Sequence, residues 1–313
     1  MPDWMHAADD HGILALRDLV AAGLTPRDVA RLGRTGDLTK LARSWYALGP
    51  VPDGEELHVL SVHAMLRSHE GRAVAGYHSG LIRLGVPTYG ADLTVVRLSR
   101  RTPGPTNTTP TCRLGRAVPD WMQWEETVAP ALAAVQHGIT SGPMAALVAA
   151  DGALNHGLMT RQDLDDALAV TRHHPRSGGI ASLLVHADGR HESPGETRLA
   201  HVLRLMGIRA TPQVTVEDGL RRAVVDFMLD DEPVAIEFDG RVKYGRTQDE
   251  PDPFGRRRPA SEVLWEEKRR EDWVREQGCE MVRVVNAELD GPPELRRRID
   301  QAVHRARARR RSA

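Results

Sequence analysis

The sequence predicts an α/β protein of the α+β class, with helices and strands mixed along its 313 residues. Three observations predict this class. An N-terminal segment has the order helix, turn, helix, hairpin; a middle segment mixes apolar helical patterns with the strand-like stretch DLTVVRLSR; and a C-terminal segment has the order α-β-β-β-α-β-α. Since domains usually contain about 100–200 residues, this length accommodates two or three domains. We place them at residues 1–50, 51–190 and 191–313.

Residues 1–50 have the element order of a winged helix-turn-helix. A first helix is expected over Ile13–Ala22. A second begins in LTPRDVARLG, where Thr25 stands at the N-cap and Pro26 at the first helical position. The following DLTKLARSWYAL has the β-branched and aromatic content of a hairpin. The alternative is a small helical domain with exposed arginines. The second helix carries three arginines suited to contact DNA phosphates: Arg27, Arg31 and Arg34.

Composition and charge exclude several classes of protein. The net charge of −1 indicates no partner by itself. The two cysteines, Cys112 and Cys279, lie far apart without CxxC spacing, so no zinc site is expected. The start MPDWMHAADDHG lacks the basic and apolar regions of a signal peptide, and no apolar run reaches the roughly 18 residues of a membrane span. We expect a cytoplasmic protein with no membrane partner.

The C-terminal end is strongly basic. Residues 294–313 contain eight arginines and only two acidic residues, which leaves a net charge of +6. Such a tail often binds nucleic acid, and the alternative is a solvated helix face. Lysine, by contrast, occurs only at Lys40, Lys243 and Lys268. A lysine in this arginine-rich chain therefore indicates a position where arginine would not serve.

Two carboxylates at the end of the strand VAIEFD form one half of a candidate metal site. If the preceding turn is centred on Asp231–Glu232, Asp226 in the strand RRAVVDFML lies directly opposite Glu237. Alternation along the strands then places Asp226, Glu237 and Asp239 on one face. Like charges opposite one another in a sheet are destabilising, so this patch needs a cation, a proton or free access to water. Mg²⁺ or Mn²⁺ fits, because hard cations take oxygen ligands.

Each of these residues also has a structural interpretation. Glu196 follows a serine by three positions at the start of the helix SPGETRLAHVLRLMGI, so it completes a capping box. Asp239 precedes a glycine and starts a turn, while Glu237 lies on a solvated strand face. Lys268, within WEEKRRED, belongs to a solvated helix face. Asp226 is the hardest to explain in this way, because it interrupts the apolar strand AVVDFML, where an unpaired charge is costly.

These patterns give the C-terminal segment a resemblance to a known superfamily. VVDFML followed by VAIEFDGRVKY, EKRRED and GCEMVRVV resembles the PD-(D/E)XK nucleases, and within them the very-short-patch-repair-like endonucleases, over about residues 190–305. The resemblance implies a restriction-endonuclease-like αβββαβ core and a DNA endonuclease that depends on Mg²⁺ or Mn²⁺. It implies four metal ligands: Glu196, Asp226, Glu237 and Asp239. It implies these catalytic residues: Asp226, Glu237, Lys243 and Lys268.

One position departs from the superfamily pattern. The lysine that usually stands two residues after the glutamate is replaced by Asp239, so catalysis requires Lys243 or Lys268 to substitute for it. In an endonuclease of this kind, arginines of the loop before the next helix, together with those of the basic tail, would contact phosphates. The loop arginines are Arg256, Arg257 and Arg258.

The N-terminal part is similar to the AbiEi-like antitoxins of type IV toxin–antitoxin systems. AAGLTPRDVARLGRTGDLTKLARSWYAL carries the similarity and AVAGYHSGLIRLGVPTYG extends it more loosely. It implies a winged helix-turn-helix followed by an α/β domain, DNA as a partner, transcriptional autoregulation and a cognate toxin. Two functions follow. The first is a metal-dependent DNA endonuclease. The alternative is a non-catalytic transcriptional regulator or antitoxin, which the missing lysine favours.

Overall fold

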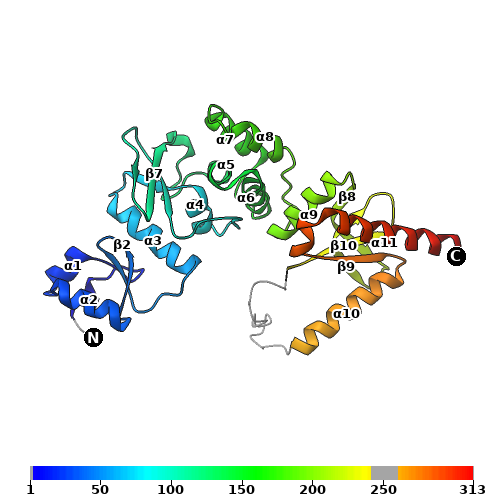
Figure 1. Cartoon of the computed structure of the whole chain (residues 1–313), viewed down its shortest axis with the longest axis horizontal. Coiled ribbons are helices and arrows are strands. Elements are labelled where there is room, and N and C mark those ends of the chain that lie inside the picture. Colours follow the sequence, from blue (N-terminus) through cyan, green and yellow to red (C-terminus); the bar gives the residue numbers. More distant parts are fainter. Residues whose placement is uncertain (1–2, 241–259, 313) are drawn as a thin grey trace. The chain divides into compact units, whose positions relative to one another are not determined.

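The computed structural model describes residues 3–240 and 260–312 (Figure 1). The chain divides into two units, residues 1–189 and residues 190–313. Both units combine helices with β-sheet, which confirms the α+β class. None of the described helices combines the length and the apolar character needed to cross a membrane.

The N-terminal elements have the order of a winged helix-turn-helix, and their three strands form a sheet in the order β1-β3-β2. The helix expected from Ile13 begins at Leu16 instead, because the preceding three residues pair with β3 as a strand. The elements are η1 (Asp3–Ala7), β1 (Ile13–Ala15), α1 (Leu16–Ala21), α2 (Pro26–Thr35), β2 (Leu38–Ala42) and β3 (Trp45–Leu48).

Thr25 caps α2, as its position predicts. The backbone N–H of Asp28 donates to the Thr25 hydroxyl at 3.3 Å, and the Asp28 carboxylate accepts the Thr25 N–H at 3.0 Å. The apolar side of α2, Val29 and Leu32, is buried against residues of α1, β1 and β2. The polar side of α2 is consequently the one that faces solvent.

A second sheet and a group of helices complete the first unit. The sheet has the order β4-β5-β7-β6, in which β5 and β7 are parallel. Its core side shares one apolar cluster with α3 and with the winged helix, so residues on both sides of position 50 contribute to one core. The helices α5 to α8 pack around a separate cluster. The elements are α3 (Glu55–Ser68), β4 (Ala73–Ala75), α4 (Tyr77–Arg83), β5 (Val96–Arg100), β6 (Asn107–Thr108), β7 (Cys112–Ala117), η2 (Asp120–Met122), α5 (Pro130–Ser141), α6 (Pro143–Asn155), α7 (Arg161–Thr171) and α8 (Ser177–Leu184).

The second unit is a three-layer arrangement with the expected αβββαβ order. A four-stranded sheet of order β11-β10-β9-β8 has α9 and α11 packed on one side and α10 on the other. The strands β10 and β11 are parallel, and the other neighbours are antiparallel. The elements are α9 (Pro194–Leu205), β8 (Ala210–Glu217), β9 (Arg222–Leu229), β10 (Val234–Asp239), α10 (Ala260–Glu276), β11 (Glu280–Val285), η4 (Asn286–Asp290) and α11 (Pro292–Ser312).

The register between β9 and β10 agrees with the prediction. The structure pairs Ala235 with Met228 and Ile236 with Phe227, which is the alignment expected for a turn centred on Asp231–Glu232. A slip of one residue would have moved every side chain of the strand to the opposite face. The turn position and the apolar pattern together were sufficient to define this alignment.

The basic tail is a folded helix whose arginines form ion pairs within the second unit. Arg305 and Arg309 contact the buried carboxylate of Glu280 at 2.8 and 3.0 Å. Arg307 contacts Glu232 at 2.6 Å. These pairs hold α11 against the strand ends and turn beneath it. They give the tail a structural role that the charge pattern did not predict.

Candidate functional site

Three acidic residues predicted to bind a metal ion come together from three elements of the second unit. Glu196 lies in the first turn of α9, Asp226 lies in β9 and Glu237 lies near the end of β10. The strands β9 and β10 pair at two positions. Beyond the second pair, the Asp226 carboxylate accepts the backbone N–H of Phe238, with 2.7 Å between N and Oδ2. This contact holds the Asp226 side chain against β10, beside Glu237.

The electrostatics of Asp226 reflect this convergence. Burial raises the pKa of Asp226 to about 6, and the negative charges of Glu196 and Glu237 act in the same direction. The Phe238 N–H and the positive charge of Arg270 oppose the shift. A carboxyl group with this pKa is poised to exchange its proton for a cation near neutral pH.

Glu196 has the contacts of a helix cap. Its carboxylate accepts a hydrogen bond from the Ser193 hydroxyl at 2.7 Å and from the backbone N–H of Glu192 at 3.0 Å. The side chain is 7% exposed. Since Glu196 also acts on the pKa of Asp226, the cap and the proximity to the acidic site are properties of the same carboxylate.

Close packing sets the position of the first turn of α9. A Cβ atom placed on Gly195 would lie 1.8 Å from Cε1 of Phe238, a distance that no side chain tolerates. The Phe238 ring therefore occupies the space where a side chain at position 195 would be. This contact brings Glu196, the next residue of α9, close to the end of β10.

Gln213 is a site residue that the sequence did not predict. It lies in β8 and has a left-handed φ of 55°. Its neighbours Pro212 and Val214 pair with Phe227 and Val225 of β9, so Gln213 lies opposite Asp226. Its Nε2 donates to Oε2 of Glu196 at 3.0 Å. A positive φ outside glycine is uncommon and often marks a functional position. Nothing in the stretch QVTV signals it, because both the backbone conformation and the partner depend on tertiary structure.

Glu237 is held by arginines rather than by lysine. Arg270 of α10 places Nη2 2.5 Å from Oε1 of Glu237, and Arg283 of β11 lies 3.9 Å from the other oxygen. Arg270 also contacts Glu267 at 2.9 Å and the carbonyl oxygen of Val224 at 3.0 Å. Although partial burial acts against it, these bonds and charges raise the pKa of Arg270. The helix that was expected to bring a lysine to this site brings an arginine.

The remaining predicted residues of the acidic site are distributed differently. Lys268 is exposed on α10, and no ion pair of it occurs among the described residues. Asp239, at the end of β10, is half-buried. Lys243 and the arginines at positions 256–258 lie outside the described residues. The structure therefore brings Glu196, Asp226 and Glu237 together and leaves the assisting cation of the site to Arg270.

The chemistry of the donor set fits a hard divalent cation. Asp226 and Glu237 supply carboxylate oxygens, which Mg²⁺ and Mn²⁺ prefer, and no thiol or imidazole joins them. Within residues 3–240 and 260–312, however, the side chains of His, Cys, Asp and Glu form no group of three or more that is arranged to hold a metal ion. The contacts above give the physical reason, since Glu196 is engaged by the cap and Glu237 by Arg270.

The arginines predicted to contact DNA lie on the solvent side of α2. Arg27, Arg31 and Arg34 are all exposed. Arg31 has one acidic neighbour, Asp28, at 3.6 Å. The β2–β3 hairpin adds two exposed cationic side chains close to this helix in sequence, Lys40 in β2 and Arg43 in the turn.

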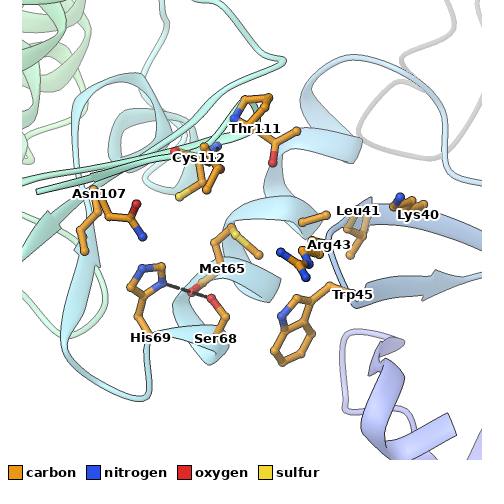
Figure 2. A pocket seen from close by; sticks show the side chains of 14 residues that line it. Lys40, Leu41, Arg43, Trp45, Met65, Ser68, His69, Asn107, Thr111 and Cys112 are labelled. Atoms are coloured by element: carbon orange, nitrogen blue, oxygen red, sulfur yellow. Dashed lines mark hydrogen bonds between the residues drawn. The ribbon is translucent and has the colours of Figure 1, made fainter. Parts of the chain in front are cut away.

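A pocket of about 600 Å³ adjoins this hairpin (Figure 2). The β2–β3 hairpin, the end of α3 and the β6–β7 segment form its walls, with Trp45 and Met65 among the apolar lining. Burial raises the pKa of the Cys112 thiol in its wall to about 11, so this group is neutral. Lys40 and Arg43 also line the pocket, and its lining residues, all within the described part of the chain, include no Asp or Glu. This side of the winged helix therefore has a positive potential.

Comparison with known proteins adds no identification. No protein-family model and no curated protein matches the chain. Among solved structures, the chain is similar to the crystal structure of the RV2827C protein from Mycobacterium tuberculosis, at 14% sequence identity and a TM-score of 0.39, over 64% of this chain and 80% of that chain. A similarity of this size supports no statement about fold or function.

Proposed function

We propose that this chain is a DNA-binding protein of the cytoplasm whose second unit hydrolyses phosphodiester bonds with the help of Mg²⁺ or Mn²⁺. One observation carries the proposal. Glu196, Asp226 and Glu237 come together from separate elements, and burial, with a further contribution from the charges of the two glutamates, raises the pKa of Asp226 to about 6. Structural carboxylates are normally paired or solvated, whereas strongly perturbed groups that cluster are typical of functional sites.

Asp226 and Glu237 would hold the metal ion, with Asp239 and Glu196 beside them. A divalent cation supplies positive charge that activates water and neutralises charge developing on a phosphate. The ionised form of Asp226 would be the one that binds a cation, and Gln213 keeps the Glu196 carboxylate oriented. Lys243 is assigned the role of orienting the attacking water, because α10 brings Arg270 rather than Lys268 to Glu237.

DNA binding is assigned first to the winged helix. Its outer helix presents Arg27, Arg31 and Arg34 to solvent, and Lys40 and Arg43 extend the positive potential onto the hairpin. Phosphate contacts of this kind position a protein on duplex DNA without specifying sequence. The arginines at positions 256–258, which lie outside the described residues, are assigned the same role of contacting phosphates.

A non-catalytic regulator or antitoxin, with a cognate toxin as partner, is the second candidate. Two observations favour it. The carboxylates are already satisfied within the protein, Glu237 by Arg270 at 2.5 Å and Glu196 by its cap. Asp239 also stands where the superfamily usually has a lysine. In this case the second unit would serve as a scaffold.

Cleavage of supercoiled plasmid separates the two candidates. Purified protein should nick or linearise the plasmid with Mg²⁺ or Mn²⁺ and not with EDTA, and Asp226→Asn should abolish the reaction. Asp230→Asn is the matched control, because Asp230 is exposed on the neighbouring turn and its carboxylate accepts a hydrogen bond from the Thr211 hydroxyl at 2.9 Å. If Asp226→Asn cleaves the plasmid as fast as the wild type does, the proposed endonuclease activity of this site is wrong. Operator footprinting without cleavage under any metal would establish the regulator.

A further inference from the structure

We propose that the part of the β5–β7 sheet around Arg97 and Arg113 is a second phosphate-binding surface, on which Arg97, Arg113 and Arg116, with Tyr77, contact the backbone of nucleic acid. These four residues are called the Arg97 surface below. The inference rests on the proposed DNA binding and extends it from the winged helix to the middle of the first unit.

The starting observation is a pair of like charges in neighbouring strands. Arg97 of β5 and Arg113 of β7 are partners in the parallel register, so their backbones lie about 5 Å apart. Their neighbours Leu98 and Leu114 are buried on the core side of the sheet. Since side chains alternate, both arginines point to the other face. Arg116 follows an irregularity in the β5–β7 register and lies close enough to Tyr77 for its charge to act on the pKa of the tyrosine hydroxyl. Like charges placed directly across a sheet are destabilising unless a counter-charge is present.

The described part of the chain places no carboxylate directly against these arginines. Within the described residues, no carboxylate lies in ion-pair distance of any arginine of the Arg97 surface, whereas other arginines of this unit, such as Arg67 with Asp9, are paired. The acid that acts on Arg97 from further away is Asp92. Its carboxylate already accepts the hydroxyl of Thr94 at 2.6 Å and the Thr94 N–H at 3.1 Å. Burial, with the charge of Arg113, lowers the pKa of Arg97.

The Tyr77 ring and its neighbours hold the Arg97 side chain in place. Its guanidinium lies over the ring of Tyr77, 5.5 Å from the ring centroid. Tyr77 has a left-handed φ of 54°, a costly conformation for an aromatic residue. The backbone N–H of Tyr77 donates to Oε1 of Gln136 at 3.1 Å, which stabilises this conformation. Burial raises the pKa of the Tyr77 hydroxyl, so the ring stays neutral beneath the arginine.

Two glycines make room for this arrangement. A Cβ on Gly115 of β7 would approach the Tyr77 hydroxyl to 3.1 Å, and a Cβ on Gly76 would lie 2.7 Å from Oε1 of Gln136. The strained tyrosine, the buried glutamine and the two small residues thus form one packed unit beneath Arg97. Strain of this kind persists where the surrounding structure enforces it, and it is concentrated at functional positions.

The chemistry of the surface favours phosphodiesters over other anions. Guanidinium groups bind phosphate oxygens through paired hydrogen bonds and remain charged at every physiological pH. Three of them without carboxylate partners match a series of phosphates rather than a single small anion. The first unit also carries the arginines of α2, so the two surfaces belong to one folded body that meets the same kind of ligand.

The test measures how the affinity for a fluorescent DNA duplex depends on salt, using the full-length protein in EDTA so that no cleavage occurs. Arg113→Gln and Arg116→Gln should each weaken binding about fivefold or more, as loss of a charge-assisted contact predicts. Each should also reduce the slope of log affinity against log salt by about 0.9. Arg113→Lys should keep the slope. Arg172→Gln, an exposed arginine of the same unit, should change nothing.

The possible outcomes separate this inference from the proposed function. If the wild-type protein binds the duplex and the glutamine variants keep its affinity and slope, the Arg97 surface is not a DNA contact, although the proposed function stands. If the wild type does not bind the duplex, both fail. If inorganic phosphate binds at Arg113, detected by its Nε–H resonance, while the variants bind DNA normally, the surface is an anion site and the inference is overturned. Circular dichroism confirms that each variant is folded.

Discussion

Asp226 and Phe238 are joined by a hydrogen bond between a side chain and a strand backbone, with Oδ2 of the aspartate 2.7 Å from the amide nitrogen. The bond lies where the pairing of β9 with β10 ends. It replaces a ladder contact and holds a carboxylate in a partly buried position next to two others. The protonation of this carboxylate and its response to metal ions test whether the three acidic residues form a functional site.

Replacing Asp226 with asparagine should change how stability depends on pH. Folding raises the pKa of Asp226 from the ordinary aspartate value of 3.8 to about 6. The stabilisation from the proton is therefore fully present below about pH 3.8 and is lost as pH rises through about 6. When the pH is raised from 4 to 7.5, the free energy of unfolding of Asp226→Asn should therefore increase by roughly 1–3 kcal/mol relative to that of the wild type. Urea unfolding in EDTA measures this difference.

Asp230→Asn provides the control for that measurement, because this exposed aspartate should leave the pH dependence of the wild type intact. If the Asp226 and Asp230 variants follow the same curve, the three carboxylates do not interact as described.

Mn²⁺ should stabilise the folded protein against heat. A ligand that binds only the native state, at a hundredfold excess over its dissociation constant, adds about 2.7 kcal/mol. The effect should disappear in Asp226→Asn and Glu237→Gln and persist in Glu217→Gln, an exposed residue at the end of β8. It should also weaken below pH 6, because Asp226 must then release a proton. Scanning calorimetry with and without Mn²⁺ reports it, and an unchanged Tm in the wild type would count against a metal site.

Gly195→Ala should be strongly destabilising. The added methyl group would overlap the Phe238 ring, so either the ring or the first turn of α9 must move. Overpacking of this kind typically costs about 1–3 kcal/mol. Gly178→Ala in α8 is the matched control. It is a helical glycine with no atom within 4 Å of the new Cβ, and it should gain about 0.5–1 kcal/mol. The two free energies of unfolding, measured in urea, should differ in sign.

Three buried histidines should make the first unit sensitive to acid. Burial lowers the pKa of His58, of His78 to about 3 and of His137 to about 4. Because the pKa values of these histidines are lower in the folded protein, the unfolded chain binds protons at a pH where the folded chain does not. Stability is therefore lost as pH falls below about 6.5 toward 4, by at most about 3 kcal/mol per histidine.

Amide hydrogen exchange in α4 and α5 checks this, after correction for the intrinsic effect of pH. Protection should fall between pH 7 and pH 5. His137→Gln should reduce that change, and the exposed His156→Gln should not. Protection that stays constant across this interval in the wild type would show that the histidines titrate normally.

Local signals in the sequence were sufficient for much of the architecture. The caps at Thr25 and Ser193 locate the starts of α2 and α9, because a side-chain oxygen accepts the free amides of the first turn. The register that pairs Ala235 with Met228 and Ile236 with Phe227 follows from the position of the turn and the apolar pattern of the two strands. Both features depend on residues within a few positions of one another.

Other features appear only when distant segments meet. The phase of α10 against the sheet decides that Arg270, and not Lys268, reaches Glu237, because residues two positions apart on a helix point about 200° apart around its axis. The left-handed Gln213, the ion pairs that occupy the arginines of α11 and the unpaired arginines around Tyr77 likewise depend on partners from other elements. The sequence by itself determined which elements form and where their charges lie along the chain. The tertiary structure decided which of those charges meet, because that depends on how helices and sheets pack rather than on any local pattern.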